Sequence, residues 1–564
     1  MKIDLLIQNA YVFMTYRQVF EKKDIAIVGD SVHQVADNLD VFIPHALTII
    51  NAKGKYIVPG LIDCHMHIES SMTYPAAFSE AALKYGTTTV VSDPHEMANV
   101  FGIKGILDFM NQETDLDIFY AIPSSVPSTS PEIETSGAIL DVKAILPLLD
   151  HDKVICLGEV MHFGDLVSLE NTEIKKIITA CQNHPKKLKI EGHCPRLSSD
   201  DLAKFIRSGV DSDHTQQTPE SILEKIDAGM FIELQKKSLS KDVITVIEKY
   251  NLYENIALIT DDVMPDDLIK GHLNQIIAKA VQLGMPFEKA IYCATYTPAR
   301  RMQLYDRGAL TPGKIADFIL LEDRNIEQPL NVFKSGKQYQ PAQNDYKFTS
   351  DFYNTVHTRL ATLSDFELHV EPSTKTVHVN VMSLSNQGTF TEKTSKMLNV
   401  KDGIIDWQSA GLSLVAVFER HGKNGNISHG LVENALLKHG AIGTTWSHDS
   451  HNLLVIGNDP ESMKSVQNRL IEIQGGFCVA FENEIIAEMP LKIGGIVSNQ
   501  PLKILASQMS QVRASIEMLG YENQNVIMSV ATLGLVVSPE LKITDKGLFN
   551  VKTQQFEPLI INEM

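Results

Sequence analysis

Two histidines, His65 and His67, follow a short apolar stretch that begins at Tyr56. Because side chains alternate between the two faces of a β-strand, residues at positions i and i+2 point the same way. Two imidazoles that converge at the carboxyl end of a strand form half of a site for a divalent metal. The spacing therefore predicts a metal centre whose remaining ligands follow other strands.

Polar residues that could complete this centre recur wherever a later predicted strand ends. In chain order they are His95, Glu96, Glu159, His193, His214 and Asp261. A single histidine at a strand end is usually structural, but unpaired buried polar groups are costly. Leaving aside His95 and Glu96, four histidines and two carboxylates at strand ends are better explained as metal ligands than as packing.

We assign these six ligands to two divalent cations about 3.5–4 Å apart. The first cation takes His65, His67 and Asp261, the second takes His193 and His214, and Glu159 bridges both. A water held between the two cations would be largely hydroxide near neutral pH. Nitrogen and oxygen ligands suit Mn²⁺, Fe²⁺ and Zn²⁺, of which we favour Mn²⁺ or Fe²⁺.

The elements that must position these residues alternate between apolar strands and helical stretches. Such alternation is typical of repeated βα units around a parallel sheet, and barrels of this type carry their catalytic residues at the carboxyl ends of the strands. Eight units in one segment match the size of a TIM barrel. The predicted strands are 57–65, 88–92, 117–122, 154–158, 188–191, 210–212, 230–234 and 256–260.

The predicted fold class is α/β, in three parts. Short strands and turn signals at both ends of the barrel segment predict a small β-sandwich module built from residues 1–55 and 301–350. The (β/α)8 TIM-type barrel occupies residues 56–300, and a C-terminal α/β domain occupies residues 351–564. The predicted strands of the last domain are 414–418, 453–456 and 477–481, and its predicted helices are 459–474 and 502–519.

The chain has 564 residues and a formal net charge of −19. This charge argues against nucleic acid or a membrane surface as a partner, although not against a small neutral base as substrate. Six cysteines without paired CxxC spacing suit a reducing compartment. No apolar run approaches ~18 residues and no signal peptide is evident, so we expect a cytoplasmic protein. The large C-terminal domain suggests a homo-oligomer.

Several motifs make the chain resemble the bacterial adenine deaminases of the amidohydrolase superfamily. They are 65–72 (HMHIESSM), 92–96 (SDPHE), 134–138 (ETSGA), 158–161 (GEVM), 192–195 (GHCP), 212–214 (SDH), 260–262 (TDD) and 447–452 (SHDSHN). The HxH pair alone marks the superfamily, whereas HIESSM and SDPHE are far more specific. Glu159 also distinguishes the adenine deaminases within the superfamily, since many other members carry a carboxylated lysine at this position.

The resemblance implies hydrolysis of adenine to hypoxanthine and ammonia at a two-metal centre, a reaction of purine salvage. Asp261 would take the proton of the attacking hydroxide and deliver it to the leaving ammonia. Ring N1 must gain a proton as C6 becomes tetrahedral. Glu96, His95 and Glu69 are candidates for that transfer or for binding the purine edge, and all three stay open.

Three positions depart from the family pattern. Thr215 replaces a glutamate, Gln235-Lys236-Lys237-Ser238 replaces an Arg-Glu-Gly-Ser block, and Asn274 replaces an aspartate. These changes keep open an alternative function, an amidohydrolase acting on another heterocyclic or cyclic-amide substrate. A third hypothesis, a non-catalytic scaffold, predicts lost ligands, yet all six remain. His448 and His451 are interpreted as part of a polar loop of the C-terminal domain, in preference to a lid over the barrel.

Overall fold

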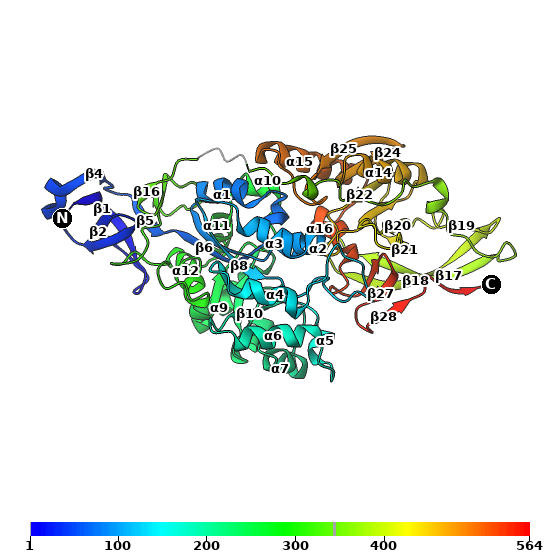
Figure 1. Ribbon diagram of the computed structural model, residues 1–564, viewed down its shortest axis with the longest axis horizontal. Helices are drawn as coiled ribbons and strands as arrows, with labels where there is room; N and C mark the ends of the chain where they lie inside the picture. The colour runs from blue at the N-terminus through cyan, green and yellow to red at the C-terminus, as the bar shows by residue number, and fades with distance from the viewer. Residues whose placement is uncertain (1, 342–345) are drawn as a thin grey trace.

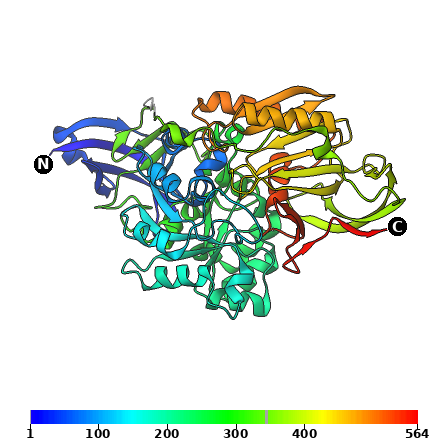
Figure 2. The same ribbon diagram turned by 45° about the vertical axis from the view of Figure 1, so that its right-hand side comes forward.

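The computed structural model describes residues 2–341 and 346–564. Three parts follow one another along its long axis: a β-rich N-terminal part, an α/β central part and a C-terminal domain (Figure 1). The two ends of the chain lie at opposite ends of the molecule in both views (Figures 1 and 2). The predicted segment 301–350 includes residues 342–345, which lie outside the described residues.

Strands from both sides of the central part pair in one N-terminal sheet. These strands are β1 (Ile3–Met14), β2 (Val19–Val28), β3 (Ser31–Ala36), β4 (Ala46–Asn51), β5 (Tyr56–Pro59), β14 (Phe318–Leu321), β15 (Asn331–Lys334) and β16 (Lys337–Gln338). The order is β16-β15-β14-β5-β1-β2-β3, with β4 beside β1. The antiparallel pair of β5 and β14, in which Phe318 lies opposite Pro59, joins residues that precede the central part to residues that follow it.

The predicted strand at 57–65 is in fact two strands that meet at Gly60. β5 belongs to the N-terminal sheet, whereas β6 (Leu61–Met66) begins the parallel sheet of the central part. A Cβ atom at residue 60 would lie 2.2 Å from Oγ1 of Thr88, so glycine is needed where the chain passes this close to its neighbour. The sequence pattern could not show the break because apolar residues continue through it.

The central part is a curled parallel sheet covered by helices (Figure 1). Its strands are β6, β7 (Thr87–Ser92), β8 (Asp117–Ile122), β9 (Val154–Val160), β10 (Lys189–Gly192), β11 (Ser212–Asp213), β12 (Phe231–Leu234) and β13 (Ile256–Leu258). Its helices are α1 (Pro75–Lys84), α2 (His95–Phe101), α3 (Ile103–Met110), α4 (Val142–Leu149), α5 (Phe163–Val167), α6 (Glu173–Asn183), α7 (Ser199–Arg207), α8 (Pro219–Asp227), α9 (Lys241–Tyr250), α10 (Pro265–Leu268), α11 (Leu273–Gln282), α12 (Phe287–Cys293) and α13 (Tyr296–Arg301). Each predicted strand of this segment overlaps an observed one.

Backbone hydrogen bonds connect the two groups of parallel strands, β6 to β10 and β11 to β13. The amide of Asp261 donates to the carbonyl oxygen of His65 at 3.3 Å, which links the last strand to the first. The amide of Asp211 donates to the carbonyl oxygen of Ile190 at 3.4 Å, which links β10 to β11. Residues at the carboxyl ends of distant strands are thereby brought together.

The C-terminal domain is built on a ten-stranded sheet. Its strands are β17 (Thr376–Leu384), β18 (Thr391–Lys401), β19 (Ile404–Ile405), β20 (Ser413–Phe418), β21 (Ile427–Glu433), β22 (Gly440–Thr444), β23 (Leu453–Gly457), β24 (Gly476–Phe481), β25 (Glu484–Pro490) and β29 (Ile560–Glu563). Beside it are α14 (Pro460–Glu472), α15 (Leu502–Met518), α16 (Val526–Ala531) and the small sheet of β26 (Leu541–Thr544), β27 (Gly547–Asn550) and β28 (Gln555–Glu557). The strands and helices predicted here are found as β20, β23, β24, α14 and α15.

The C-terminal domain packs against loops that follow the central strands (Figure 2). The amide and the hydroxyl of Thr135 donate to the carboxylate of Asp545 at 2.9 and 2.7 Å. Nδ2 of Asn452 donates to the carbonyl oxygen of Thr135 at 2.8 Å, and Arg513 on α15 pairs with Asp266 on α10 at 2.9 Å. These contacts fix the C-terminal domain over the polar strand ends.

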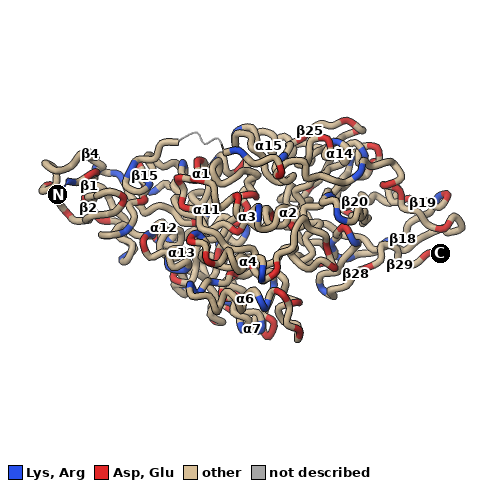
Figure 3. Tube along the Cα trace, in the orientation of Figure 1, with Lys and Arg blue, Asp and Glu red and all other residues tan. Residues whose placement is uncertain are grey.

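The described residues include no helix that is both long and apolar enough to cross a membrane. Acidic and basic residues are interspersed along the chain in all three parts of the molecule (Figure 3). The net negative charge of the chain is thus distributed rather than gathered in one part.

Candidate metal centre and active site

The six predicted ligands come together at the carboxyl ends of the central strands. They are His65 and His67 at the end of β6, Glu159 in β9, His193 after β10, His214 after β11 and Asp261 after β13. All of them except His193 are buried. The donor atoms of His65, His67 and Asp261 lie within 4.8 Å of one another, and so do those of His65, Glu159 and His214. Segments far apart in sequence therefore form one polar cluster.

Glu159 lies between the histidines of this cluster. Its Oε2 atom is 2.8 Å from Nδ1 of His193 and 3.0 Å from Nε2 of His214, while its Oε1 atom is 3.6 Å from Nε2 of His67. Burial disfavours the charged carboxylate, but His214 and His193 hold the pKa of Glu159 well below its usual range. An ionised carboxylate that directs its two oxygens to different histidines has the arrangement of a bridging ligand.

The backbone fixes which nitrogen of His67 is free. Nδ1 of His67 donates to the carbonyl oxygen of Asp93 at 2.9 Å, because a carbonyl oxygen can only accept. In the neutral ring Nε2 then carries the lone pair, and it faces Oδ1 of Asp261 at 3.4 Å. A histidine that binds a metal through one nitrogen commonly donates from the other in this way.

Three donor atoms of the cluster have no hydrogen-bond partner within the described ranges: Nε2 of His65, Nδ1 of His214 and Oε2 of Glu159. The imidazole contacts of Oε2 are short but lack the geometry of hydrogen bonds. A buried polar atom without a partner costs about 1–3 kcal/mol, which is explained for Nε2 of His65 and Oε2 of Glu159 if they face a cation. In His214 it is Nε2, 3.0 Å from Oε2 of Glu159, that faces the cluster. Nitrogen and oxygen donors without a thiolate fit a divalent metal centre.

Asp93 supports the centre although we did not predict a role for it. Its carboxylate accepts a hydrogen bond from the amide of Glu159 at 3.1 Å. The same carboxylate packs on Gly158, where a Cβ atom would lie 2.0 Å from Oδ2 of Asp93. Since its carbonyl oxygen also holds His67, Asp93 orients two of the predicted ligands at once. The SDPHE motif could have pointed to this role of Asp93, but we selected only His95 and Glu96 from it.

Asp213 plays a similar part beside His214. It forms a buried ion pair with Lys225 at 2.6 Å, and it accepts hydrogen bonds from the hydroxyl of Thr215 at 2.8 Å and from the amide of Cys194 at 3.0 Å. These partners hold the loop ends of β10 and β11, which carry two of the histidines. Cys194 itself is buried and forms no disulfide.

Glu69 and Glu96 are buried carboxyl groups next to this cluster. Glu69 accepts a hydrogen bond from the amide of Met97 at 3.3 Å, and Oε1 of Glu96 lies 3.3 Å from the hydroxyl of Ser70. The second oxygen of each has no hydrogen-bond partner among the described residues. Burial raises the pKa of Glu96 to about 8 and that of Glu69 to about 7. A proton is thus available here near neutral pH.

His95 lies between the ligand cluster and the C-terminal domain. Its Nδ1 atom is 3.7 Å from Oε1 of Glu159, and its Nε2 atom is 3.8 Å from Oδ1 of Asp449. Burial lowers the pKa of His95 to about 4, so the ring is neutral near pH 7. A molecule held at Glu159 would therefore lie within reach of a neutral imidazole.

The interpretation of His448 and His451 as part of an ordinary polar loop was wrong for His448. Residues 447–452 are buried, and Nε2 of His448 lies 3.5 Å from Oε1 of Glu96. His451 is also buried, and within the described ranges neither of its ring nitrogens has a hydrogen-bond partner. Packing of the C-terminal domain on the central strands is a contact between distant segments, which spacing cannot reveal. The sequence did hint at this contact, because the motif at 447–452 is rich in His and Asp.

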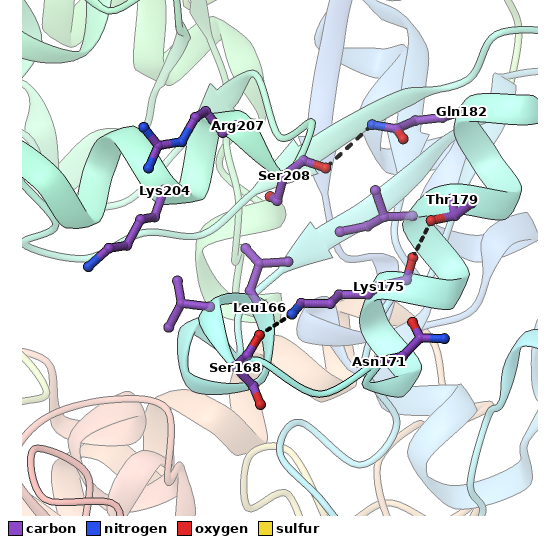
Figure 4. A pocket seen from close by; sticks show the side chains of 11 residues that line it. Leu166, Ser168, Asn171, Lys175, Thr179, Gln182, Lys204, Arg207 and Ser208 are labelled. Atoms are coloured by element: carbon purple, nitrogen blue, oxygen red, sulfur yellow. Dashed lines mark hydrogen bonds between the residues drawn. The ribbon is translucent and has the colours of Figure 1, made fainter.

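An open groove of about 540 Å³ lies elsewhere, on the outer helices α5, α6 and α7 (Figure 4). Lys175, Gln182 and Arg207 are among the side chains that line it. The described residues around this groove include none of the predicted ligands, so it is not the candidate site.

Residues 56–343 match the model of the Amidohydrolase family, and residues 388–555 match that of the Adenine deaminase C-terminal domain. The chain is 48% identical over 562 residues to "Adenine deaminase 2" of Oenococcus oeni, with 99% of each chain covered. It is 47% identical over 565 residues to "Adenine deaminase" of Clostridium perfringens, with 98% of each chain covered. The chain belongs to the adenine deaminase family. Its curled parallel sheet is accordingly an amidohydrolase fold of the TIM-barrel type with a C-terminal domain.

Most departures from the adenine deaminase pattern have supporting roles in the structure. Thr215 holds Asp213, as described above, and Nε2 of Gln235 donates to the carbonyl oxygen of His214 at 2.8 Å. Asn274 is buried, and its side chain forms hydrogen bonds with backbone groups. These three side chains therefore help to hold loops beside the predicted ligands.

Lys237 is the departure that reaches the ligand cluster. Its Nζ atom lies 3.9 Å from Oδ2 of Asp261, while its side chain is 51% exposed. The ammonium group is one of the neighbours that lower the pKa of Asp261, although water around its exposed side chain screens the charge.

Proposed function

We propose that this protein hydrolyses adenine to hypoxanthine and ammonia. The observation that carries the proposal is the position of Glu96, a buried carboxyl group with one free oxygen, beside the cluster of the six predicted ligands. The relatives named adenine deaminase, which match over nearly the whole chain, support adenine as the substrate. The protonated carboxyl and the ligand cluster are the two features that attack on a purine C6 requires.

Two divalent cations would occupy this centre, Mn²⁺ or Fe²⁺ in preference to Zn²⁺. Their proposed ligands are His65, His67 and Asp261 for the first cation, His193 and His214 for the second, and Glu159 for both. When bound, such cations lower the pKa of water and orient it for attack.

The side chains of this site would move the protons of the reaction. Asp261 takes a proton from the attacking water and passes it to the leaving amine, while Glu96 donates a proton to ring N1. A C6–O bond forms, and the bond from C6 to the exocyclic nitrogen breaks as the amine takes the proton from Asp261. The remaining proton of the C6 hydroxyl returns to Glu96, which leaves hypoxanthine with a proton on N1, and ammonia. Glu69 and neutral His95 bind the purine edge. Glu96 is ranked first as the acid because burial raises its pKa the furthest, to about 8.

We also propose the finer features of the fold. The eight central strands close into a (β/α)8 barrel within residues 56–300, and the hydrogen bond between Asp261 and His65 supports this closure. The N-terminal sheet folds as a β-sandwich of residues 1–55 and 301–350, and residues 351–564 form the third domain. The protein would act in purine salvage in the cytoplasm, as a homo-oligomer.

Turnover of adenine by the purified protein, reconstituted with Mn²⁺, tests this function. Release of both hypoxanthine and ammonia is expected, with loss of both in Asp261→Asn. A panel of other heterocyclic amines and cyclic amides should react more slowly than adenine. Rapid turnover of one of these compounds without turnover of adenine would favour the alternative amidohydrolase, for which Lys237 beside Asp261 is the specific observation.

A further inference from the structure

The reaction scheme leaves one feature unexplained, which is why a loop of the C-terminal domain reaches the buried Glu96. Nε2 of His448 lies 3.5 Å from Oε1 of Glu96. Nδ1 of the same ring lies 3.0 Å from Oδ1 of Asp449. The three side chains therefore form a row in the order Asp449, His448, Glu96, which crosses from the C-terminal domain to α2 of the central part.

Ser70, the other neighbour of the Glu96 carboxyl group, holds this group only weakly. The hydroxyl of Ser70 lies 3.3 Å from Oε1 of Glu96 but 2.6 Å from Oδ1 of Asp262. A hydroxyl group has a single proton to donate, and the shorter contact with Asp262 takes it. Nε2 of His448 has no hydrogen-bond partner among the described residues, so at 3.5 Å from Oε1 it is the N–H group free to engage this oxygen.

The ring of His448 is itself fixed by the C-terminal domain. The backbone amide of His448 donates to the carbonyl oxygen of Ala531 at 3.1 Å. The indole of Trp446 packs edge-to-face on the imidazole, with ring centroids 4.4 Å apart. The imidazole thus has one buried orientation, and its outer nitrogen is directed at the carboxyl group.

We propose that His448 is a positioning residue, which is oriented by Asp449 and donates to Oε1 of Glu96 so that Oε2 is presented to the purine ring. This inference rests on the proposed function, since it concerns the acid of that reaction. Burial disfavours charge on the ring, yet Glu96 and Asp449 raise the pKa of His448 to about 9, which agrees with a donor at both nitrogens. The C-terminal domain is then part of the active site.

Variants of His448 separate this role from a purely structural one. His448→Leu should lower kcat for adenine about 100-fold, because a misplaced catalytic group costs that much, with little change in KM. His448→Gln keeps an N–H donor near the position of Nε2 and should recover about tenfold of the lost kcat. Asp449→Asn should also lower kcat. It provides a second variant if His448→Leu does not fold.

His451→Leu is the matched control, because His451 is a buried histidine of the same loop. It should reduce thermal stability like His448→Leu but leave kcat within about threefold of the wild type. Equal kcat values in His448→Leu and His448→Gln, or equal losses in the control, would overturn the positioning role.

Metal content gives a second readout that does not depend on activity. The variants of His448 should retain the wild-type number of cations per chain. Loss of a cation would overturn the proposal, since it would make His448 a metal ligand together with His95 and Asp449, whose donor atoms lie within 4.8 Å of one another. If the wild-type protein fails to deaminate adenine, the proposed function itself fails. If the wild type deaminates adenine and His448→Leu has the same kcat, the positioning role is refuted while the proposed function stands.

Discussion

The backbone amide of Asp261 donates a hydrogen bond to the carbonyl oxygen of His65 at 3.3 Å. Asp261 has a φ angle of 59°, a left-handed conformation that aspartate tolerates better than most residues. Two side chains proposed to bind the same cation are therefore joined through the backbone as well. Their spacing is set by pairing of the first and last strands, which makes metal affinity depend on the integrity of the whole sheet.

Removal of divalent cations should lower the thermal stability of the protein. A ligand that binds only the folded state stabilises it by RT ln(1 + [L]/Kd), so a chelator should decrease Tm and excess Mn²⁺ should restore it. Elemental analysis should find two cations per chain in the wild type and fewer in Glu159→Gln. A Tm that is insensitive to both chelator and Mn²⁺ would refute the proposed centre.

Glu96→Gln should decrease kcat/KM for adenine by about 10²–10⁴, the usual contribution of a general acid. The amide has nearly the shape of the carboxyl group but no acidic proton to deliver to N1. Metal content should stay at the wild-type level, because Glu96 is not a proposed ligand. Exposed Glu80 on α1 offers a control, and Glu80→Gln should leave kcat/KM unchanged. Similar activity of the two variants would remove Glu96 from the mechanism.

Lys225→Met should destabilise the folded protein by about 3–5 kcal/mol, since it leaves the buried charge of Asp213 without its partner. Urea unfolding of the metal-loaded protein measures this loss. Asp213→Asn in the same background should recover part of it, because the remaining buried group is then neutral. Lys204→Met removes an exposed lysine that pairs with Asp200 and should change stability little. A small effect of Lys225→Met would contradict the buried pair.

Lys542 should make stability depend on pH. It is buried in the C-terminal domain, where its ammonium group donates to the carbonyl oxygen of Thr389 at 2.9 Å. Burial lowers the pKa of Lys542 from 10.5 to about 7. Between these pH values the unfolded chain binds a proton that the folded protein lacks, so stability rises with pH across this window.

Lys542→Met should therefore flatten the rise in Tm between pH 7 and pH 10 and increase Tm most near pH 7. Thermal unfolding of both proteins across this range is the measurement. Parallel pH profiles for wild type and variant would show that Lys542 is not the titrating group.

The alternation of strands and helices was predictable because it depends on local hydrophobic periodicity. The positions of His65, Glu159 and Asp261 were predictable for the same reason, since polar residues at strand ends of a parallel sheet share one edge. The structure brings these side chains together, while their role as ligands stays a prediction.

Features that depend on contacts between distant segments could not be predicted. The break at Gly60 follows from the closeness of Thr88, and the approach of His448 to Glu96 follows from the packing of a separate domain. Asp93 acts partly through its carbonyl oxygen, a group that every residue has. A side-chain pattern carries no sign of such a role.

The pairing of β5 with β14 has a consequence for the order of events on the ribosome. The whole central part lies between these two neighbouring strands, so β14 is made only after it. At about 5–20 residues per second, its synthesis takes on the order of tens of seconds. Throughout that time the edge of β5 that carries Ile57 and Val58 has no partner and is open to pairing with another nascent chain. Early folding of the central part shortens the path that β14 must travel to cover that edge.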